Sequence, residues 1–434
     1  MWLKGVVHTS LRSGWVVSVL AVVIAFLVGA LLIAITGANI LDAYVYLFKG
    51  AIFNSDSSSF VRQIKPLTDS FFYAIPLILA GLGIGFGFKA GLFNIGGAGQ
   101  VIFGALAAIW VSFTFHLPAG LHLVVALAAA MLAGGVYAGI AGFLKAKTGA
   151  NEVIVTIMLN SIATLAISYI LSLPSWHAEG SNQPLTPIAA QTAQLPAILP
   201  APFKLHFGLV IAIVATFVYW WMVQRSTFGF QVRAVGANPH AARTAGMSIE
   251  TVTTWTMVVA GVFCGLAGAN EALGTMPSAN QGVSTGVAGT IGFDAITVAL
   301  LGRNKPLGIF FSGLLFGALK AGGYKMQTQG VPIDMILILE SVIVLLIAAP
   351  ALVRFVFRLP QPDGKTLRSY VASLAEGSSA SDTASGQASE PEESDASEAS
   401  GASEASEKHE LAEDNIADQV HQRPRPVNDV KEAQ

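Results

Sequence analysis

Five polar side chains lie in or beside strongly hydrophobic stretches, and they are the chain's first candidates for chemistry. They are Asn94, Gln100, Asn160, Glu271 and Asp294. At membrane depth a polar group is costly unless it pairs or lines a water-filled path. Amide side chains donate and accept hydrogen bonds without carrying charge, which suits a neutral polar solute. We therefore expect these residues to line a path for such a solute.

Each candidate also has a simpler structural interpretation, which stays open. Asn94 and Gln100 belong to the stretch FNIGGAGQ, a glycine-broken entry into a helix that is equally consistent with a cap and a tight turn. Asn151 resembles an N-cap, and Glu152 favours the positive end of the helix that follows. Asn160 lies two turns deeper and has no such local role. The two carboxylates could instead be helix-end groups in contact with water.

No motif for catalysis accompanies these residues. The sequence has no Gly-x4-Gly-Lys-Ser/Thr phosphate loop, no His-Glu-x2-His and no Gly-x-Ser-x-Gly. Cys264 is the single cysteine, and the eight histidines are scattered. We therefore expect no enzyme active site, no metal and no cofactor bound by this chain.

A polar loop at 225–250 separates two hydrophobic segments. It reads RSTFGFQVRAVGANPHAARTAGMSIE and carries three arginines. Its HAARTAG portion predicts a short helix, because small residues allow close approach to a partner and a glycine ends a helix. The candidate docking residues are His240, Ala241, Ala242, Arg243 and Gly246. A membrane protein with such a docking helix would take its energy from a partner.

The elements that position these residues are membrane-spanning helices. The chain of 434 residues is 53% hydrophobic and only 12% charged, and its apolar residues come in long runs. The expected segments are 15–36, 70–88, 99–116, 119–143, 153–173, 206–223, 252–272, a short 291–301, 307–324 and 334–353. The short one reads as a half-helix followed by a basic turn with Pro306. An all-α integral membrane protein with about ten helices follows, and Glu340 is expected to pair inside its bundle.

The distribution of Lys and Arg among the connections predicts which side of the membrane each one faces. With a cytoplasmic N-terminus, the inner connections hold fourteen Lys and Arg residues and the outer ones hold six, Lys320 among them. Both termini and the 225–250 loop are then cytoplasmic. The longest outer loop, 174–205, could cap a pore, meet an external partner or simply connect two helices.

We expect the chain to consist of a transmembrane domain between a short N-terminal segment and a C-terminal tail. Residues 1–14 form a cytoplasmic N-terminus, 15–355 a transmembrane domain and 356–434 a cytoplasmic tail. From Glu376 onward there are 15 acidic and 4 basic residues among Ser, Ala and Gly. Such a composition predicts a disordered, solvated spacer.

Four motifs in order resemble the permease subunits of bacterial ABC importers for simple sugars and nucleosides, nearest the nucleoside branch. They are FNIG…GQ at 93–100, NEVI…TIMLN at 151–160, AVG…AA…G at 234–246 and GFD…VALLGRNKPLG at 292–308. The resemblance covers about residues 10–355. It implies an ATPase with two nucleotide-binding halves that carries ATP and Mg, a second homologous permease, an extracellular substrate-binding lipoprotein and a lipid bilayer, with no nucleic acid.

Two positions depart from that family pattern. His240 stands where the coupling helix usually begins with Glu, and Ala98 stands where relatives commonly carry Glu. The first departure implies a different groove on the ATPase, and the second puts a pathway carboxylate at 98 in doubt.

The expected function is import of a nucleoside by alternating access. An importer of simple sugars or branched-chain amino acids on the same architecture is the main alternative. A self-powered secondary transporter is disfavoured by the docking loop and by the lack of a clear intramembrane carboxylate–cation pair. A scaffold that works through its tail is a third alternative.

Overall fold

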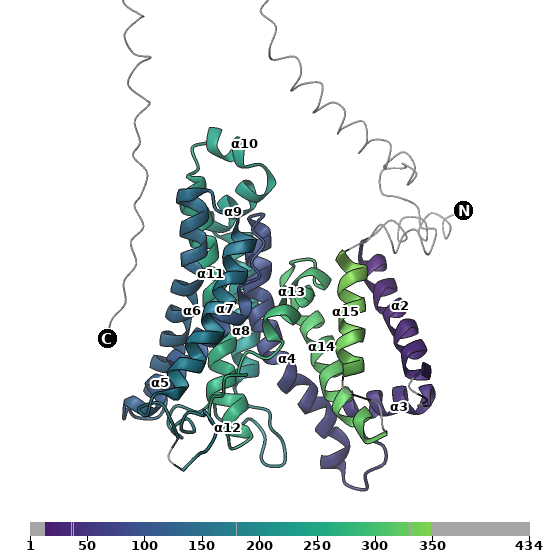
Figure 1. The fold of residues 1–434 in the computed structure, drawn as a ribbon. Helices are drawn as coiled ribbons and strands as arrows, with labels where there is room; N and C mark the ends of the chain where they lie inside the picture. The colour runs from purple at the N-terminus through teal and green to yellow at the C-terminus, as the bar shows by residue number, and fades with distance from the viewer. Residues whose placement is uncertain are drawn as a thin grey trace, which may run out of the picture. The chain divides into compact units, whose positions relative to one another are not determined.

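A computed structural model describes residues 14–348 of the chain, except 36, 38, 179, 330, 331 and 333. The predicted tail lies outside the described residues. The described part is helical, with only two isolated β-bridges, Leu185–Ser284 and Ala197–His206. Figure 1 shows the helices α2(Gly14–Ile35), α3(Ile40–Ala51), α4(Phe60–Lys89), α5(Gly97–Thr114), α6(Leu121–Thr148), α7(Glu152–Ser172), α8(Gly208–Arg225), α9(Thr227–Ala237), α10(Pro239–Thr244), α11(Ile249–Asn270), π-helix η1(Glu271–Thr275), α12(Met276–Ser278), α13(Ile291–Leu301), α14(Pro306–Met326), 3-10 helix η2(Gln327–Gln329) and α15(Asp334–Ala348).

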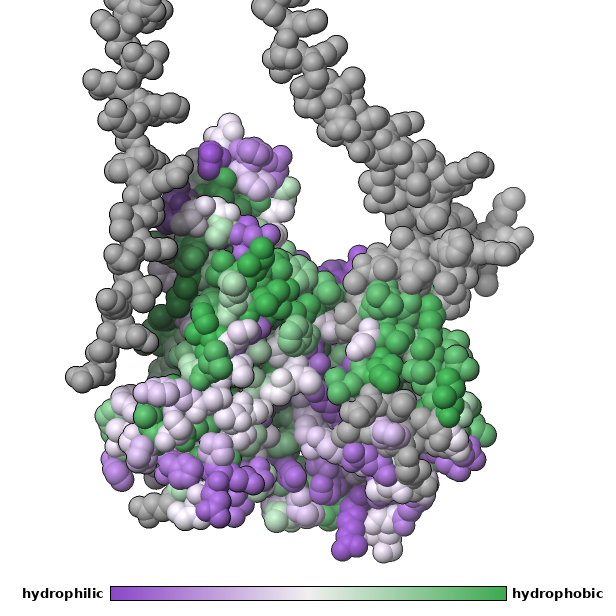
Figure 2. Space-filling view, in the orientation of Figure 1, coloured by the Kyte–Doolittle hydropathy of each residue, from purple (hydrophilic) through white to green (hydrophobic). Residues whose placement is uncertain are grey.

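Seven of these helices are long and apolar enough to cross a membrane, among the residues described. They are α4, α5, α6, α7, α8, the continuous stretch Ile249–Ser278 and α14. The other three predicted segments correspond to α2, to the 11-residue α13 and to α15. Figure 2 shows apolar surface over the middle of the helices and hydrophilic surface at their ends. This distribution is the one expected of helices that face lipid.

Helix α4 is the centre of the bundle, and it contacts α8, α11, α13 and α14. Its most apolar stretch is 83% buried. Gly83 allows α11 to approach closely, because a Cβ there would lie 2.4 Å from the Ala260 carbonyl oxygen. Small residues give helices in lipid this kind of contact, since hydrophobicity supplies no drive between them. The interpretation of the helix glycines as packing residues is confirmed here.

Helices α6 and α11 pack extensively against each other and lie side by side in Figure 1. A Cβ on Gly134 would lie 2.4 Å from the Gly261 carbonyl oxygen, and one on Gly261 would lie 2.2 Å from that of Gly134. Both glycines are therefore required by the contact itself. Since α11 begins next to α10 and ends at η1 and α12, those two groups lie at opposite ends of the bundle.

Three features differ from the expected elements. Helix α4 begins at Phe60, ten residues before the predicted span, and α3 and α9 were not predicted at all. The extra part of α4 is polar because it includes Lys65 and Asp69, which pair four residues apart along one helix face at 2.5 Å. Hydropathy alone could not detect a helix of this kind.

The predicted half-helix is confirmed. Helix α13 ends at Leu301 and is followed by Arg303 and Asn304, both with a φ of 54°. The Tyr219 hydroxyl donates a hydrogen bond of 3.0 Å to the Asn304 carbonyl, which ties the turn to α8. Pro306 then begins α14, as a proline can at a first helical position.

Candidate functional site

The short helix α10 is closed at both ends by its own sequence. The Asn238 side chain accepts hydrogen bonds of 3.0 and 3.1 Å from two backbone N–H groups at its start. At the other end Gly246 has a φ of +83°, and the Met247 backbone N–H donates to the Ala242 carbonyl at 3.0 Å. These are an N-cap and a glycine-terminated C-cap. The predicted helix and its terminating glycine are confirmed.

Four of the five predicted docking residues on and beside α10 are exposed. They are His240, Ala241, Arg243 and Gly246. Ala242 differs, because it is only 3% exposed and packs into the hydrophobic core of its own chain. The helix stands at one end of the bundle in Figure 1, and its other four candidate residues are exposed there. Docking stays a prediction, with Ala242 as the anchor of the helix.

Helix α9 connects α10 to the centre of the bundle. Gly236 packs against the end of α4, where a Cβ would lie 2.1 Å from the Lys89 carbonyl oxygen. Phe228 stacks on Phe86 of α4, with ring centroids 6.1 Å apart. A displacement of α10 therefore has a continuous packed route to α4.

The three predicted amide side chains meet at one turn. Asn94 and Gln100, both almost fully buried, exchange two hydrogen bonds of 3.2 and 3.1 Å. Asn160 of α7 accepts from the Gly99 backbone N–H and donates to the Ile95 carbonyl, each at 2.8 Å. In this conformation the amides bond to one another and to the backbone, as in the cap-and-turn interpretation. A role in a solute path stays a prediction.

Asp294 lies in a buried charge cluster at the start of α13. Its Oδ2 accepts hydrogen bonds from Lys320 Nζ and from the Thr290 hydroxyl, both at 2.6 Å. Glu340 of α15 is 4% exposed and lies close enough to interact electrostatically with Asp294 and Lys320. Its Oε1 has no hydrogen-bond partner among the described residues. The Lys320 ammonium thus bonds to the Asp294 carboxylate, and Glu340 is a second buried carboxylate within electrostatic range of that pair.

This cluster corrects two expectations. Lys320 is not in an outer connection but inside α14, one of the helices long and apolar enough to cross a membrane, where it forms an ion pair with Asp294. The absence of a clear intramembrane carboxylate–cation pair can no longer be used against a secondary transporter.

Glu271 bonds to a neighbour in its own helix and not to Asn94, Gln100 or Asn160, the residues of the amide turn. It begins the π-helix η1, is 5% exposed and accepts a 3.0 Å hydrogen bond from the Thr275 hydroxyl. Single π-turns inside α-helices occur frequently at functional sites. No sequence signal indicated this turn, since a π-bulge leaves no composition pattern of its own.

Aromatic side chains near the charge cluster were also missed. Tyr73 of α4 and Tyr324 of α14 stack with ring centroids 5.4 Å apart and an interplanar angle of 30°. Both stood in stretches that a hydropathy reading assigns to packing. The sequence did contain a signal for the charge cluster, namely Lys320 inside an apolar run, because a lysine in such a run is rare unless it is paired.

Residues 67–349 match the family described as the permease component of branched-chain amino acid transport systems. The chain belongs to this family of permeases. The family resemblance expected from the motifs is thereby confirmed, and the permease is a multi-pass protein of the bacterial plasma membrane. No solved structure matches it.

Individual relatives cover most of the permease. It is 38% identical to the guanosine permease protein NupP of Bacillus subtilis, over 79% of this chain and 96% of the relative. It is 34% identical to the glucose permease protein TsgB13 of Haloferax volcanii, over 75% and 85%. It is 31% identical to the nucleoside permease protein NupB of Lactococcus lactis, over 84% and 98%. A second permease protein from each of these organisms matches at 26% or 27% identity.

Proposed function

We propose that this chain is a permease subunit of an ATP-driven importer that moves nucleosides into the cell. The observation that carries this proposal is its similarity, over nearly their whole length, to proteins named as guanosine and nucleoside permeases. The amide turn and the small number of buried charges suit a neutral solute with hydroxyl groups and a base. The chain itself is non-catalytic.

The energy would come from a separate ATPase with two nucleotide-binding halves. ATP and Mg belong to that subunit, and this chain binds neither. The capped helix α10, with four exposed residues at one end of the bundle, supports a docking contact there. An extracellular substrate-binding lipoprotein would deliver the nucleoside at the opposite end, near α12.

The second half of the membrane part would be a different permease. Each of the three organisms above has two matching permeases, and this chain is 31–38% identical to one and 26–27% to the other. That consistent difference favours two specialised subunits over two copies of one. Tagged chain purified together with an untagged copy of itself would contradict the proposal.

The proposed topology has ten membrane segments with both termini in the cytoplasm. Seven helices satisfy the length and hydropathy of a span, and α2, α13 and α15 supply the remaining three segments. Lys and Arg are concentrated on the side that carries α10, which supports placing that side in the cytoplasm. Residue 1 and the acidic tail then lie on the same side as the ATPase.

Transport would proceed by alternating access. ATP-driven closure of the ATPase would move α10, and the contacts of α9 with α4 would relay that motion into the bundle. Opening a path requires some buried hydrogen bonds to exchange partners. Asn94, Gln100 and Asn160 would do so at the amide turn, and Glu271 and Asp294 nearer the other end.

Glucose import is the second candidate, because a protein named as a glucose permease is 34% identical to this chain. Uptake of labelled guanosine, uridine, glucose and leucine should be compared in cells with and without the gene. We expect deletion to abolish uptake of the nucleosides alone. Unchanged nucleoside uptake would refute the proposal, and loss of glucose uptake would establish the alternative. An uncoupler that stopped uptake while cellular ATP stayed high would instead favour a secondary transporter.

A further inference from the structure

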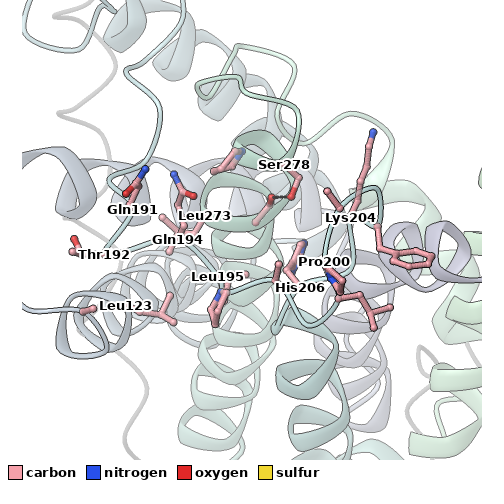
Figure 3. Close-up of a pocket in the computed structure, with 18 of the residues that line it drawn as sticks. Leu123, Gln191, Thr192, Gln194, Leu195, Pro200, Lys204, His206, Leu273 and Ser278 are labelled. Carbon is pink, nitrogen blue, oxygen red and sulfur yellow. Dashed lines mark hydrogen bonds between the residues drawn. The ribbon is translucent and has the colours of Figure 1, made fainter. Parts of the chain in front are cut away.

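A cavity of about 580 Å³ opens at the end of the bundle opposite α10. Figure 3 shows it between the loop before α8, the start of α6 and the η1–α12 segment. Its walls combine leucines with uncharged polar residues of that loop, including Leu123, Leu195, Leu273, Gln191 and Gln194. We call this space the loop cavity. Its volume is within the range of small-molecule sites, which are mostly apolar with a few placed polar groups.

The walls of the loop cavity are held by hydrogen bonds to the helices. The ring of His122 in α6 bonds to the Val111 carbonyl through Nε2 at 3.2 Å and to the Thr192 hydroxyl through Nδ1 at 2.7 Å. The Leu195 backbone N–H donates to the Leu273 carbonyl of η1 at 2.8 Å. The loop is therefore a fixed wall rather than a simple connection, and the cavity exists before any ligand arrives.

His206 lines this cavity and carries a buried hydrogen-bond donor that has no partner among the described residues. The side chain is 2% exposed, and its Nδ1 accepts a hydrogen bond of 3.2 Å from the Gly208 backbone N–H. Burial lowers the pKa of His206 to about 4, so the ring is neutral near pH 7. A neutral ring whose Nδ1 accepts must carry its proton on Nε2. That Nε2 has no hydrogen-bond partner among the described residues.

Two glycines make room for this imidazole. A Cβ on Gly274 would lie 2.6 Å from His206 Cε1 and 2.7 Å from Nε2, and one on Gly208 would lie 2.8 Å from Nδ1. Gly274 lies in the π-helix η1, so the bulge itself brings a residue without a side chain to the ring. Any larger residue at either position would push the ring away. The fold thus keeps an unpaired N–H at a costly buried position.

The chemistry around His206 selects the kind of ligand. The Lys204 ammonium points away from the imidazole in Figure 3, and the cavity has no other charged lining residue. A ligand there needs an acceptor atom for the N–H, and its body must tolerate leucine walls and amide groups. A neutral nucleoside has both, through its base carbonyl or ring nitrogen atoms and its flat ring. A nucleotide would bring several phosphate charges, for which the lining offers one cation, Lys204, directed away from the imidazole.

We propose that the loop cavity is an entry site for the nucleoside on the receptor side of this permease, with the His206 Nε2–H as the donor that selects the base. The inference rests on the proposed function and deepens it. A side chain of the lipoprotein receptor is the competing occupant. The volume and the mixed apolar and amide lining favour the small molecule.

The test uses the complete complex of both permeases and the ATPase in lipid nanodiscs, without receptor. Binding of tritiated guanosine is measured by equilibrium dialysis for wild type and for His206→Phe, which keeps a ring but removes the N–H. We expect binding about tenfold weaker in His206→Phe, with partial recovery in His206→Gln, whose amide N–H replaces the donor. Asn182→Met, exposed in the same loop but outside the cavity lining, is the matched control and should bind as wild type does.

Gln191→Trp keeps the test valid if His206→Phe fails to fold. Gln191 is exposed at the cavity mouth, so a tryptophan there blocks entry without disturbing the helices. We expect it to abolish receptor-free binding. Guanosine bound equally well by His206→Phe and Gln191→Trp would overturn the proposal. The proposal would also be overturned if these variants bound guanosine normally and lost only receptor docking, because the cavity would then hold a receptor side chain. Failure of wild-type complex with receptor to transport any nucleoside would instead refute the proposed function.

Discussion

Asp294 and Lys320 form a 2.6 Å ion pair between α13 and α14, with Glu340 of α15 as a second carboxylate nearby. The pair joins a half-helix that is too short to span the membrane to a full-length neighbour. The pair therefore ties α13 to α14, and Glu340 adds a buried carboxylate from a third helix. Charged residues within membrane-spanning helices are rare and usually paired, which makes this pair a candidate functional site.

Breaking the pair from the lysine side should be strongly destabilising. Lys320→Met leaves the buried Asp294 carboxylate without its cation, and removal of one partner of a buried pair costs about 3–5 kcal/mol. Thermal unfolding of the purified permease in nanodiscs measures this loss. The double variant Asp294→Asn with Lys320→Met should recover most of the lost stability, because Glu340 is then the one carboxylate of the cluster that stays uncompensated. Equal stability of the single and double variants would show that the pair does not hold α13.

Asn160 offers a way to separate a path role from a structural role. Asn160→Leu removes the hydrogen bonds to Gly99 and Ile95, and the loss should cost roughly 1–3 kcal/mol. We expect a lower unfolding temperature together with lower nucleoside uptake. Uptake that falls while the unfolding temperature stays unchanged would mean that Asn160 acts on the solute alone. Ser161→Leu, at the next position and exposed, is the matched control.

Local signals in the sequence were sufficient for much of this fold. Asn151 caps α7 as expected, with its side chain accepting from the Val153 N–H, and a glycine ends α10. Apolar runs located the long helices, and the short run at 291–301 was correctly taken as a half-helix. Each of these features depends on residues a few positions apart, so the chain itself displays them.

Contacts between distant residues could not be predicted in the same way. Asn160 bonds to Ile95, 65 positions away, and Lys320 pairs with Asp294, 26 positions away. The buried position of Ala242 and the free Nε2 of His206 also depend on neighbours that packing supplies. The sequence could name polar residues as candidates, but which of them meet is a property of the packed bundle.

His206 should make the loop region sensitive to acid. An unperturbed histidine has a pKa of 6.5 and the folded ring one of about 4, so between these values only the unfolded chain binds the proton. Stability is therefore complete above about pH 6.5 and falls as the pH drops, by at most about 3 kcal/mol near pH 4. Unfolding temperatures of wild type and His206→Phe should be measured from pH 7.5 to 4.5. The variant should lose part of this dependence, and identical curves would contradict the assignment.

The docking role of α10 can be tested with two neighbouring alanines. Ala241 is exposed and Ala242 is 3% exposed against its own chain. Ala241→Trp should leave the unfolding temperature unchanged but reduce copurification of the ATPase and abolish uptake, because bulk at a docking face blocks contact without entering the core. Ala242→Trp should lower the unfolding temperature, since overpacking a buried site typically costs about 1–3 kcal/mol.

A third variant controls for the position of the tryptophan. Phe230→Trp in α9 adds bulk at an exposed site outside α10 and should leave both ATPase binding and uptake intact. If Ala241→Trp retains a bound and fully stimulated ATPase, the exposed face of α10 is not the coupling surface. The basic turn at Arg303, which follows the half-helix α13, would then be the next surface to test, because its Arg303 and Lys305 are both exposed.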